Sequence, residues 1–242
     1  MVCQLRELAQ RSGDPVRSAP TPSRKTARAT GTRKSQGRET LRDYGRAIPR
    51  EVWDRQYRQG AWESLDSIHE SGHYMVIAGY IHHLFVSPTV LDVGCGPGRL
   101  GGLVKALACK SYLGIDLSPE AIKQARRRTT THARFRVADL NQWNPSGRFS
   151  AIVFCESLNY AARPASTLVR YARALEPEGV LIVSLCRHRN HGRIWKNVAR
   201  EFTILDVTTV TNRKQQTWDI KVLRPRPNGG TGSRRDTSRE SG

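Results

Sequence analysis

Short apolar or alternating runs recur along the chain, separated by stretches in which apolar residues follow helical spacing. The runs predict seven strands, at 90–93, 111–116, 134–138, 149–154, 180–185, 202–210 and 216–222. Helical spacing predicts helices at 100–107, 118–128 and 164–175, and a turn at 176–179 precedes the fifth strand. Strands that alternate with helices predict the α/β fold class.

A second helical region precedes the first strand. Residues 51–57 and 74–85 predict two helices, and a turn at 60–62 lies between them. Elements in this position can cover a pocket at the edge of the sheet. We therefore interpret residues 48–88 as a helical lid and 89–224 as the core of the same single domain.

The two ends of the chain differ in composition from the rest. Residues 1–47 and 225–242 are rich in Ser, Thr, Gly, Pro and Arg and poor in large apolar residues, so we expect both to be disordered tails. Residues 1–46 alone carry +7 of the net charge of +19, which makes that charge weak evidence for a nucleic-acid partner. The first tail fits an organelle transit segment, a nucleic-acid-binding arm or an extension without a folded role.

Cysteine spacing and hydropathy bear on the compartment. The five cysteines occur singly, which argues against a zinc ribbon or a disulfide framework and fits a reducing environment. No apolar run approaches the roughly 20 residues that span a bilayer. We expect a soluble, cytoplasmic protein without membrane contact, and nothing in the sequence indicates its oligomeric state.

The stretch from Asp92 to Gly98 joins the first predicted strand to the next helix and contains three alternating glycines, Gly94, Gly96 and Gly98. Glycines let the backbone close against a bound ligand, which side chains would prevent. A carboxylate at the strand end repels phosphate and attracts a positive group. The pattern therefore predicts a site for a cationic cofactor.

This stretch resembles the first motif of the class I S-adenosylmethionine-dependent methyltransferases, which reads acid-x-Gly-x-Gly-x-Gly. The resemblance runs from about residue 53 to 223 and implies a doubly wound, mostly parallel seven-stranded sheet of Rossmann-like type. It implies S-adenosyl-L-methionine as the cofactor, with Asp92 and the Cys155 carbonyl at its ammonium group. It also implies that Asp139 and the backbone of Leu140 bind its adenine.

Asp116 ends the second predicted strand, and Leu117 follows it. An acid about 20 residues after a glycine turn has the spacing that places its oxygens against the hydroxyls of a ribose. Ser118 and Pro119 then have the character of an N-cap and a first helical residue. We expect Asp116 and Leu117 to belong to the cofactor site.

The lid region carries a second resemblance. The stretch from Trp62 to Tyr74 is similar to a segment of the nodulation-type N-methyltransferases, in which a Trp is followed by an Arg-Tyr pair that closes over the methionine end of the cofactor. Here His73 occupies the position of that arginine. An imidazole can still bond the cofactor carboxylate, but its charge depends on pH. Trp62 and His73 are therefore predicted cofactor contacts.

The end of the fourth predicted strand faces the transferred methyl group, because ligands in an open α/β sheet lie beyond the carboxyl ends of its strands. Methyl transfer requires alignment, a dry site and removal of one proton. Glu156, His188 or His191 can act as the base, and Asn159 and Tyr160 can position the acceptor. A structural role for Glu156 fits the sequence equally well.

The stretch His69-Glu70-Ser71-Gly72-His73 matches the H-E-x-x-H signature of zinc metalloproteases. The third ligand at a plausible spacing would be Asp92, which lies on a predicted strand, and Gly72 weakens the helix that the motif requires. We therefore expect no metal site.

These observations together predict a methyltransferase that acts on N or O of a small molecule or sugar-type metabolite, which would be its partner. One alternative is an NAD(P)-dependent oxidoreductase, because residues 96–101 satisfy G-x-G-x-x-G. In that fold, however, the turn begins at the strand end, where Asp92 and Gly94 stand. Another alternative is an RNA-binding or RNA-modifying protein, which the charge suggests, although the sequence contains no aromatic-basic repeat.

Overall fold

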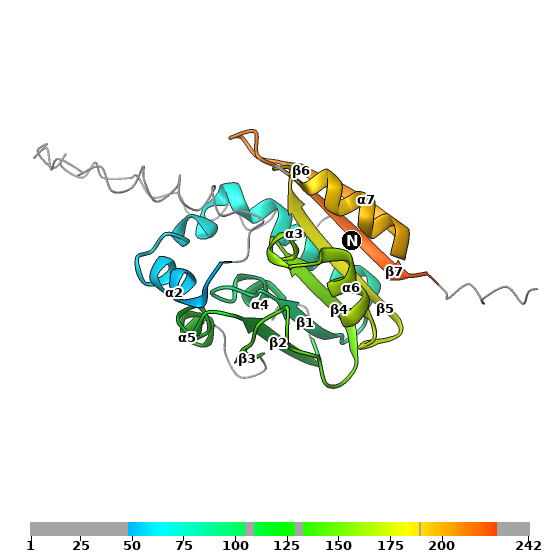
Figure 1. The fold of residues 1–242 in the computed structure, drawn as a ribbon, viewed down its shortest axis with the longest axis horizontal. Helices are drawn as coiled ribbons and strands as arrows, with labels where there is room; N and C mark the ends of the chain where they lie inside the picture. The colour runs from blue at the N-terminus through cyan, green and yellow to red at the C-terminus, as the bar shows by residue number, and fades with distance from the viewer. Residues whose placement is uncertain (1–47, 105–108, 129–132, 189, 227–242) are drawn as a thin grey trace, which may run out of the picture.

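The computed structural model describes residues 48–104, 109–128, 133–188 and 190–226. A seven-stranded sheet has the order β3-β2-β1-β4-β5-β7-β6 (Figure 1). Its strands are β1 Thr89–Val93, β2 Ser111–Asp116, β3 Ala133–Val137, β4 Phe149–Cys155, β5 Leu175–Cys186, β6 Phe202–Thr211 and β7 Thr217–Pro225. Neighbouring strands are parallel except β7, which is antiparallel to β5 and to β6. The predicted α/β class, with a doubly wound and mostly parallel sheet, is confirmed.

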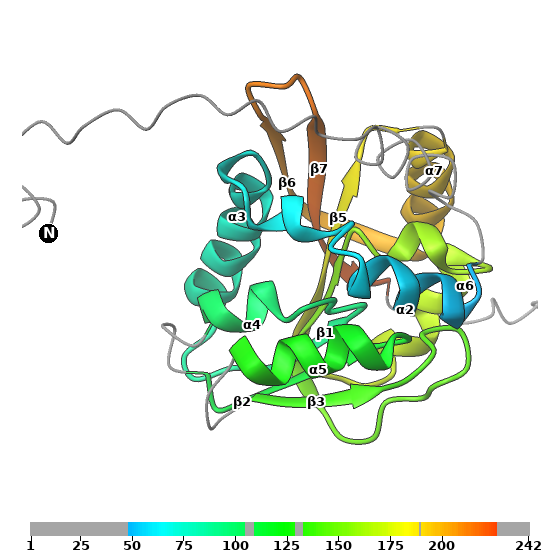
Figure 2. The same cartoon turned by 90° about the vertical axis from the view of Figure 1, so that its left-hand side faces the viewer.

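Helices cover both faces of the sheet (Figures 1 and 2). They are α2 Arg50–Arg58, α3 Ile68–Leu84, α4 Arg99–Val104, α5 Pro119–Arg128, α6 Pro164–Ala172 and α7 His191–Glu201, with the 3-10 turns η1 Glu63–Asp66 and η3 Leu158–Tyr160. One apolar core joins α3, α4 and α5 to the sheet, and a second joins α6 and α7 to the other face. β4 is buried along its whole length because it lies between the two cores.

Helix α3 is longer than predicted. It begins at Ile68 instead of residue 74, so it contains Gly72, which we expected to weaken a helix. The reason is tertiary: a Cβ at position 72 would lie 2.8 Å from Val210 Cγ1 on β6. Glycine lets α3 approach the sheet this closely, and packing against the sheet outweighs the low helix propensity.

The turn predicted before the fifth strand is instead a bulge inside β5. The strand begins at Leu175, and its register against β4 shifts before Val180. The extra residues place the Glu176 carboxylate where it accepts hydrogen bonds from the hydroxyls of Thr89 and Ser150, each at 2.9 Å. The bulge therefore ties together the first residues of β1, β4 and β5, at the edge of the sheet opposite the glycine loop.

Most of both predicted tails, residues 1–47 and 227–242, lies outside the described residues. Pro225, which we assigned to the second tail, is the last residue of β7. The basic stretch that follows β5 largely forms helix α7. Among the helices of the described part of the chain, none has the length and apolar content needed to cross a bilayer.

Candidate active site

The glycine loop joins β1 to α4 at the carboxyl edge of the sheet. Gly94, Gly96 and Gly98 have φ angles of 74°, 51° and 79°, in a region that side chains disfavour. Gly94 also lacks space for a side chain, because a Cβ would lie 2.4 Å from Ser157 Cβ. The amide of Gly94 donates a hydrogen bond of 2.8 Å to the Ile115 carbonyl, which holds the loop against β2.

Asp92 presents a buried carboxylate in which only one oxygen is satisfied. Its exposed fraction is 1%. Oδ2 accepts a hydrogen bond from the Tyr112 hydroxyl on β2, whereas Oδ1 has no hydrogen-bond partner among the described residues. Burial raises the pKa of Asp92 to about 7, the Tyr112 hydroxyl opposes this shift, and the charge of Asp116 adds to it. A buried, unpaired carboxylate oxygen fits a cationic ligand group.

Asp116 connects the glycine loop to the helix that follows β2. Its Oδ2 accepts a hydrogen bond from the Gly96 amide and its Oδ1 from the Ser118 amide, both at 2.9 Å. Burial raises the pKa of Asp116 to about 6, although these backbone amides act in the opposite direction. Leu117 is half-buried beside it. The predicted N-cap is confirmed, because Ser118 Oγ accepts a hydrogen bond from the Ala121 amide at 3.1 Å.

Asp139 and Leu140 follow β3 in a turn. Asp139 Oδ1 accepts a hydrogen bond from the Asn141 amide at 2.8 Å. The Leu140 carbonyl accepts one from the Tyr171 hydroxyl at 3.3 Å and another from the Arg170 guanidinium, so α6 holds this turn.

The three carboxylates follow three neighbouring parallel strands. Asp92 is in β1, Asp116 ends β2, and Asp139 comes shortly after β3, in the spatial order β3-β2-β1. Parallel strands end at the same edge of a sheet, so the fold brings all three residues to the edge that carries the glycine loop.

Helix α2 lies beside α5, over the glycine loop (Figure 2). The Asp54 carboxylate accepts hydrogen bonds from Ser118 Oγ at 2.5 Å and from the Glu120 amide at 3.3 Å, which fastens α2 to the first turn of α5. One turn along α2 lies Tyr57, and a Cβ on Gly96 would be 3.1 Å from its hydroxyl. The lid region therefore covers the loop directly.

Trp62 belongs to an aromatic cluster between the lid and β4. Its ring centroid lies 5.5 Å from that of Trp53 and 6.1 Å from that of Tyr57, and its Nε1 donates a hydrogen bond of 3.3 Å to Gln56 Oε1. Trp53 meets Tyr160 edge-on, with centroids 5.0 Å apart. Because Tyr160 belongs to η3, this cluster connects the lid to the segment that follows β4.

Glu156 directly follows Cys155, the last residue of β4, and has a φ of 56°, which is uncommon outside glycine. Its Oε1 accepts a hydrogen bond from the Ser184 hydroxyl at 2.8 Å, and its Oε2 accepts one from the Cys186 amide at 2.9 Å. Both oxygens thus hold the ends of β4 and β5 together. This geometry favours the structural of the two roles that the sequence left open.

Two other predicted residues lie near these strand ends. Asn159 is 2% exposed, and neither atom of its side-chain amide has a hydrogen-bond partner among the described residues. His188 follows β5 and is half-buried, and its carbonyl accepts a hydrogen bond from the His191 amide at 3.2 Å.

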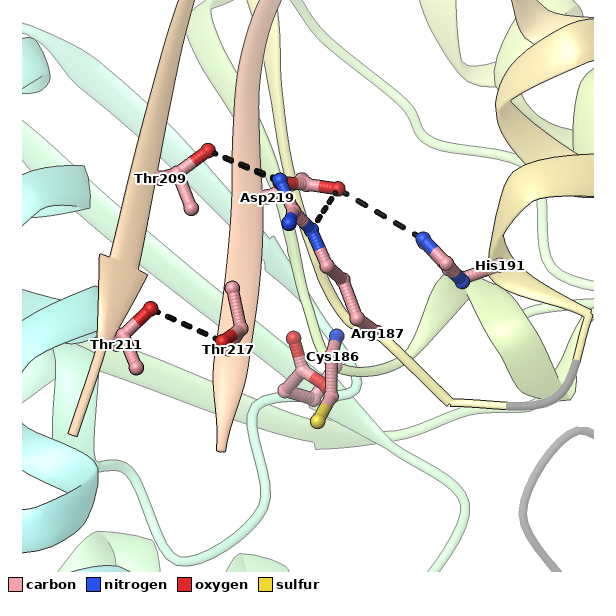
Figure 3. A network of polar contacts seen from close by, with 8 residues as sticks. Cys186, Arg187, His191, Thr209, Thr211, Thr217 and Asp219 are labelled. Atoms are coloured by element: carbon pink, nitrogen blue, oxygen red, sulfur yellow. Dashed lines mark hydrogen bonds and ion pairs between the residues drawn. The ribbon is translucent and has the colours of Figure 1, made fainter. Parts of the chain in front are cut away.

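His191, the third candidate base, belongs to a polar network around Asp219 of β7 (Figure 3). Arg187 donates two hydrogen bonds to Asp219 Oδ1, at 3.0 and 2.7 Å, and the Thr209 hydroxyl donates a third at 3.0 Å. His191 Nε2 lies 3.8 Å from Oδ2. Burial alone would raise the pKa of Asp219, but Arg187 and Thr209 outweigh it and the net shift is downward. The network fixes the start of α7 against β7.

Comparison with known proteins identifies the family. A model of the methyltransferase domain family matches residues 86–224. The chain belongs to this family. The first-motif resemblance is thereby confirmed, and the oxidoreductase alternative loses its basis because the glycine loop lies inside the matched methyltransferase domain.

Individual relatives match shorter stretches of the chain. Trans-aconitate 2-methyltransferase from Methylobacterium nodulans is 37% identical over 97 residues, which cover 40% of this chain and 37% of that protein. Nodulation protein S from Rhizobium tropici is 32% identical over 124 residues, covering 49% and 51%. The chain thus spans about half or less of the length of these curated relatives.

A solved structure resembles the chain over more of its length. The N-methyltransferase NodS from Bradyrhizobium japonicum, in complex with S-adenosyl-L-homocysteine, has a TM-score of 0.65 at 18% identity and covers 74% of this chain and 98% of its own. At this identity the likeness concerns the fold. The resemblance to the nodulation-type enzymes is confirmed.

The H-E-x-x-H stretch at residues 69–73 lies on α3, in a helix as a zinc site would require. His73, however, is fully buried, and its ring stacks on Trp218 with centroids 4.7 Å apart. Among the described residues no group of three or more His, Cys, Asp or Glu side chains is arranged to hold a metal ion.

The environment of His73 corrects one expectation about its charge. Burial, and secondly the charge of Arg99, lower the pKa of His73 to about 3, and neither ring nitrogen has a hydrogen-bond partner among the described residues. The imidazole is therefore neutral at ordinary pH, so His73 is not the pH-dependent charge that its place in the sequence suggested.

We expect His73→Phe to stabilise the protein in mild acid. Between its usual pKa of 6.5 and its folded value of about 3, the unfolded chain binds a proton that the folded chain does not. Stability is therefore lost as pH falls through this range. Removing the imidazole should raise the free energy of unfolding at pH 5, relative to pH 8, by up to about 2 kcal/mol. Urea denaturation at both pH values measures the change.

His82→Phe, at an exposed position of the same helix, is the control. An equal response of the two variants would contradict the prediction.

The sequence analysis missed Tyr112, Tyr57 and Asp54. Tyr112 was detectable in principle, because a tyrosine within an apolar strand needs a polar partner for its hydroxyl. Asp54 and Tyr57 carry no local signal, since their partners Ser118 and Gly96 lie far along the chain.

Proposed function

We propose that this protein is an S-adenosyl-L-methionine-dependent methyltransferase that transfers a methyl group to N or O of a small molecule, such as a metabolite or a sugar. The observation that carries the proposal is the Asp92 carboxylate, which is 1% exposed and has one oxygen that no described residue hydrogen-bonds, beside the glycine loop. A buried anion of this kind requires a cationic partner, and the α-ammonium group of the cofactor supplies one. The names of the relatives include an O-methyltransferase and an N-methyltransferase, so both acceptor atoms stay within the proposal.

The predicted residues divide the cofactor between them. Asp92 and the Cys155 carbonyl would hold its ammonium group. Gly94, Gly96 and Gly98 would let the backbone of the loop lie close against the cofactor. Asp116 and Leu117 would bind the ribose, whereas Asp139 and the Leu140 amide would bind the adenine. Trp62 would close the lid over it. As a neutral imidazole, His73 would donate one hydrogen bond to its carboxylate.

The acceptor would bind beyond the end of β4. The bound cofactor supplies an electrophilic methyl group on a positively charged sulfur. Asn159 and Tyr160 would position the acceptor, because the buried Asn159 amide has no hydrogen-bond partner within the described part of the chain and Tyr160 contacts the lid through Trp53. Glu156 or His188 could accept the acceptor's proton, although Glu156 already receives two hydrogen bonds from β5.

The proposal includes a cytoplasmic location, which the free state of the cysteines supports. Cys95, Cys109, Cys155 and Cys186 are all free thiols. Free thiols persist in reducing compartments.

Calorimetric titration of the full chain tests the proposed function. S-adenosylmethionine and S-adenosylhomocysteine should each bind one site with a Kd on the order of 1–100 μM, the range in which enzymes commonly meet their substrates. NADH should give no heat at the same concentrations. Binding of NADH together with the absence of binding by both sulfur nucleosides would overturn the proposal.

A further inference from the structure

Residues 50–66 of the lid region form a strap, which consists of helix α2, the turn η1 and the residues between them (Figure 2). Few of its side chains are buried: Gln56 and Tyr57 in α2, and none in η1. Helix α3, which follows the strap, is anchored by fully buried side chains such as Ile77 and Ile81. The strap therefore makes little apolar contact with the domain, so polar contacts matter more for holding it in place.

The strap lies on residues that we propose to bind the cofactor. A Cβ on Gly96 would be 3.1 Å from the Tyr57 hydroxyl, so α2 reaches the glycine loop. The Asp54 carboxylate accepts a hydrogen bond from Ser118 Oγ, two residues after Asp116. A ligand that binds under the strap must enter and leave past it, as in other enzymes with lids.

One carboxylate fastens the far end of the strap to two other helices. Asp66, the last residue of η1, accepts hydrogen bonds from Arg128 Nη1 at 2.6 Å and from Arg128 Nη2 at 2.5 Å. It accepts another from Arg99 Nη1. Arg128 ends α5, and Arg99 begins α4 directly after Gly98. The contact with Arg128 is bidentate, which is the strong geometry for an arginine and a carboxylate.

Two guanidinium groups thus share the single carboxylate of Asp66. The hydrogen bond from Arg128 lowers the pKa of Asp66 more than burial raises it, so the carboxylate is ionised at neutral pH. Without this charge, the guanidinium groups of Arg99 and Arg128 would repel each other. A cavity of about 310 Å³, lined by both arginines, Gly98 and the exposed Met75, gives them room to separate. The side chains of Asp66 and Arg128 are 43% and 42% exposed, so dissolved ions reach the pair.

We propose that Asp66, Arg99 and Arg128 form an ionic latch that holds the strap over the glycine loop and limits the rate at which the cofactor enters and leaves. The inference rests on the proposed function, because it takes the cofactor site to lie under the strap. Asp66 is a positioning residue, since it acts through the strap and not on the cofactor. The latch weakens with salt, because the Debye length falls from about 10 Å at 0.1 M to about 3 Å at 1 M.

Stopped-flow mixing of the full chain with S-adenosylhomocysteine tests the latch. Trp53 and Trp62 belong to the strap, so tryptophan fluorescence reports on the binding step. The slope and the intercept of the observed rate against ligand concentration give the association and dissociation rate constants. At about 0.02 M salt, Asp66→Asn should raise both constants at least about threefold, which is the scale of a partly exposed ion-pair network.

Two further results are expected of the same variant. The Kd should stay within about twofold of the wild-type value, because the strap has to move for entry as well as for exit. At about 1 M salt the rate constants of Asp66→Asn and wild type should converge, because salt screens the ion pair that the variant lacks.

Glu63→Gln is the matched control. Glu63 is an exposed carboxylate of the same turn η1, and it takes part in none of the ion pairs of the described residues. Its substitution should leave both rate constants unchanged. Arg128→Gln, at the exposed end of α5, should accelerate both constants, and the double variant with Asp66→Asn should be no faster than Asp66→Asn alone. If Asp66→Asn does not fold, Arg128→Gln replaces it.

Each other outcome overturns the latch. Rate constants of Asp66→Asn that match wild type or Glu63→Gln would do so and would leave the proposed function intact. The same holds if dissociation alone accelerates and the Kd rises by the same factor, because Asp66 would then stabilise the bound ligand without limiting its passage. An acceleration that persists in about 1 M salt would exclude an ionic latch. Failure of the wild type to bind S-adenosylhomocysteine would overturn both the latch and the proposed function.

Discussion

Asp92→Asn should weaken the binding of S-adenosylmethionine about 100-fold. The substitution keeps the shape of the side chain and removes the negative charge that faces the cofactor's ammonium group, and a hydrogen bond to a charged group contributes about 1.5–3 kcal/mol. Calorimetric titration at pH 8, where the wild-type carboxylate is ionised, measures the loss. Tyr112→Phe is the matched control: it removes the other partner of Asp92 but leaves the charge, so affinity should fall only about threefold.

The same substitution should stabilise the cofactor-free protein at high pH. The pKa of Asp92 rises from 3.8 to about 7 on folding, so the folded chain binds more protons than the unfolded chain between these values. The stability that this group contributes is complete below pH 3.8 and is lost as pH rises through 7. Asparagine does not ionise, so the free energy of unfolding of the variant relative to wild type should increase between pH 4 and 8, by up to about 4 kcal/mol.

Urea denaturation without cofactor at the two pH values measures this second effect. A variant that is destabilised equally at pH 4 and pH 8, or that binds the cofactor as tightly as wild type, would contradict the assignment of Asp92. The two effects have opposite signs: the substitution weakens cofactor binding and raises the free energy of unfolding at high pH. Replacing a carboxylate with only a structural role would lower the free energy of unfolding and would leave cofactor binding unchanged.

Gly94→Ala should be the most damaging alanine substitution among the described glycines. The new Cβ would lie 2.4 Å from Ser157 Cβ, and the backbone would keep a φ of 74°. Steric overlap costs about 1–3 kcal/mol, and the left-handed backbone adds about 1 kcal/mol or more. We expect the free energy of unfolding to fall by about 3 kcal/mol and cofactor binding to disappear, because the loop must move away from the strand end.

Gly102→Ala is the control for this change. Gly102 lies within α4, and apart from the backbone of that helix no atom of the described residues lies within 4 Å of an added Cβ. Alanine there should raise the free energy of unfolding by about 0.5–1 kcal/mol, because glycine lowers helix stability. Denaturation of both variants in urea, with titration of S-adenosylhomocysteine, measures the pair. Equal effects at positions 94 and 102 would show that the loop does not need its glycine geometry.

Local sequence patterns were sufficient to propose the framework of the candidate site. Asp92 and the glycines were found because an acid followed by alternating glycines is confined to a few consecutive residues. Asp116 and Asp139 were found because each follows a strand that could be recognised from its own hydrophobic pattern. Once these strands are parallel neighbours, their ends must meet at one edge.

Features that depend on distant residues could not be predicted. Gly72 argued against a helix, but its lack of a side chain is what lets α3 pack on Val210, 138 positions later by its number in the chain. His73 held the place of an arginine, yet burial against Trp218 makes it neutral. Glu156 fitted two roles equally, and only the hydrogen bonds from Ser184 and Cys186 distinguish them.

The sequence alone therefore determined the family, the α/β class, the strand ends and the identity of the acids that follow them, since each of these is encoded within a few neighbouring residues. The tertiary structure decided which of those groups are charged, which oxygens are already hydrogen-bonded, and which lid side chains face the ends of β4 and β5. The physical reason is that desolvation and hydrogen bonding depend on what packs against a group, and the contacts of Asp92 with Tyr112 and of His73 with Trp218 come from other parts of the chain.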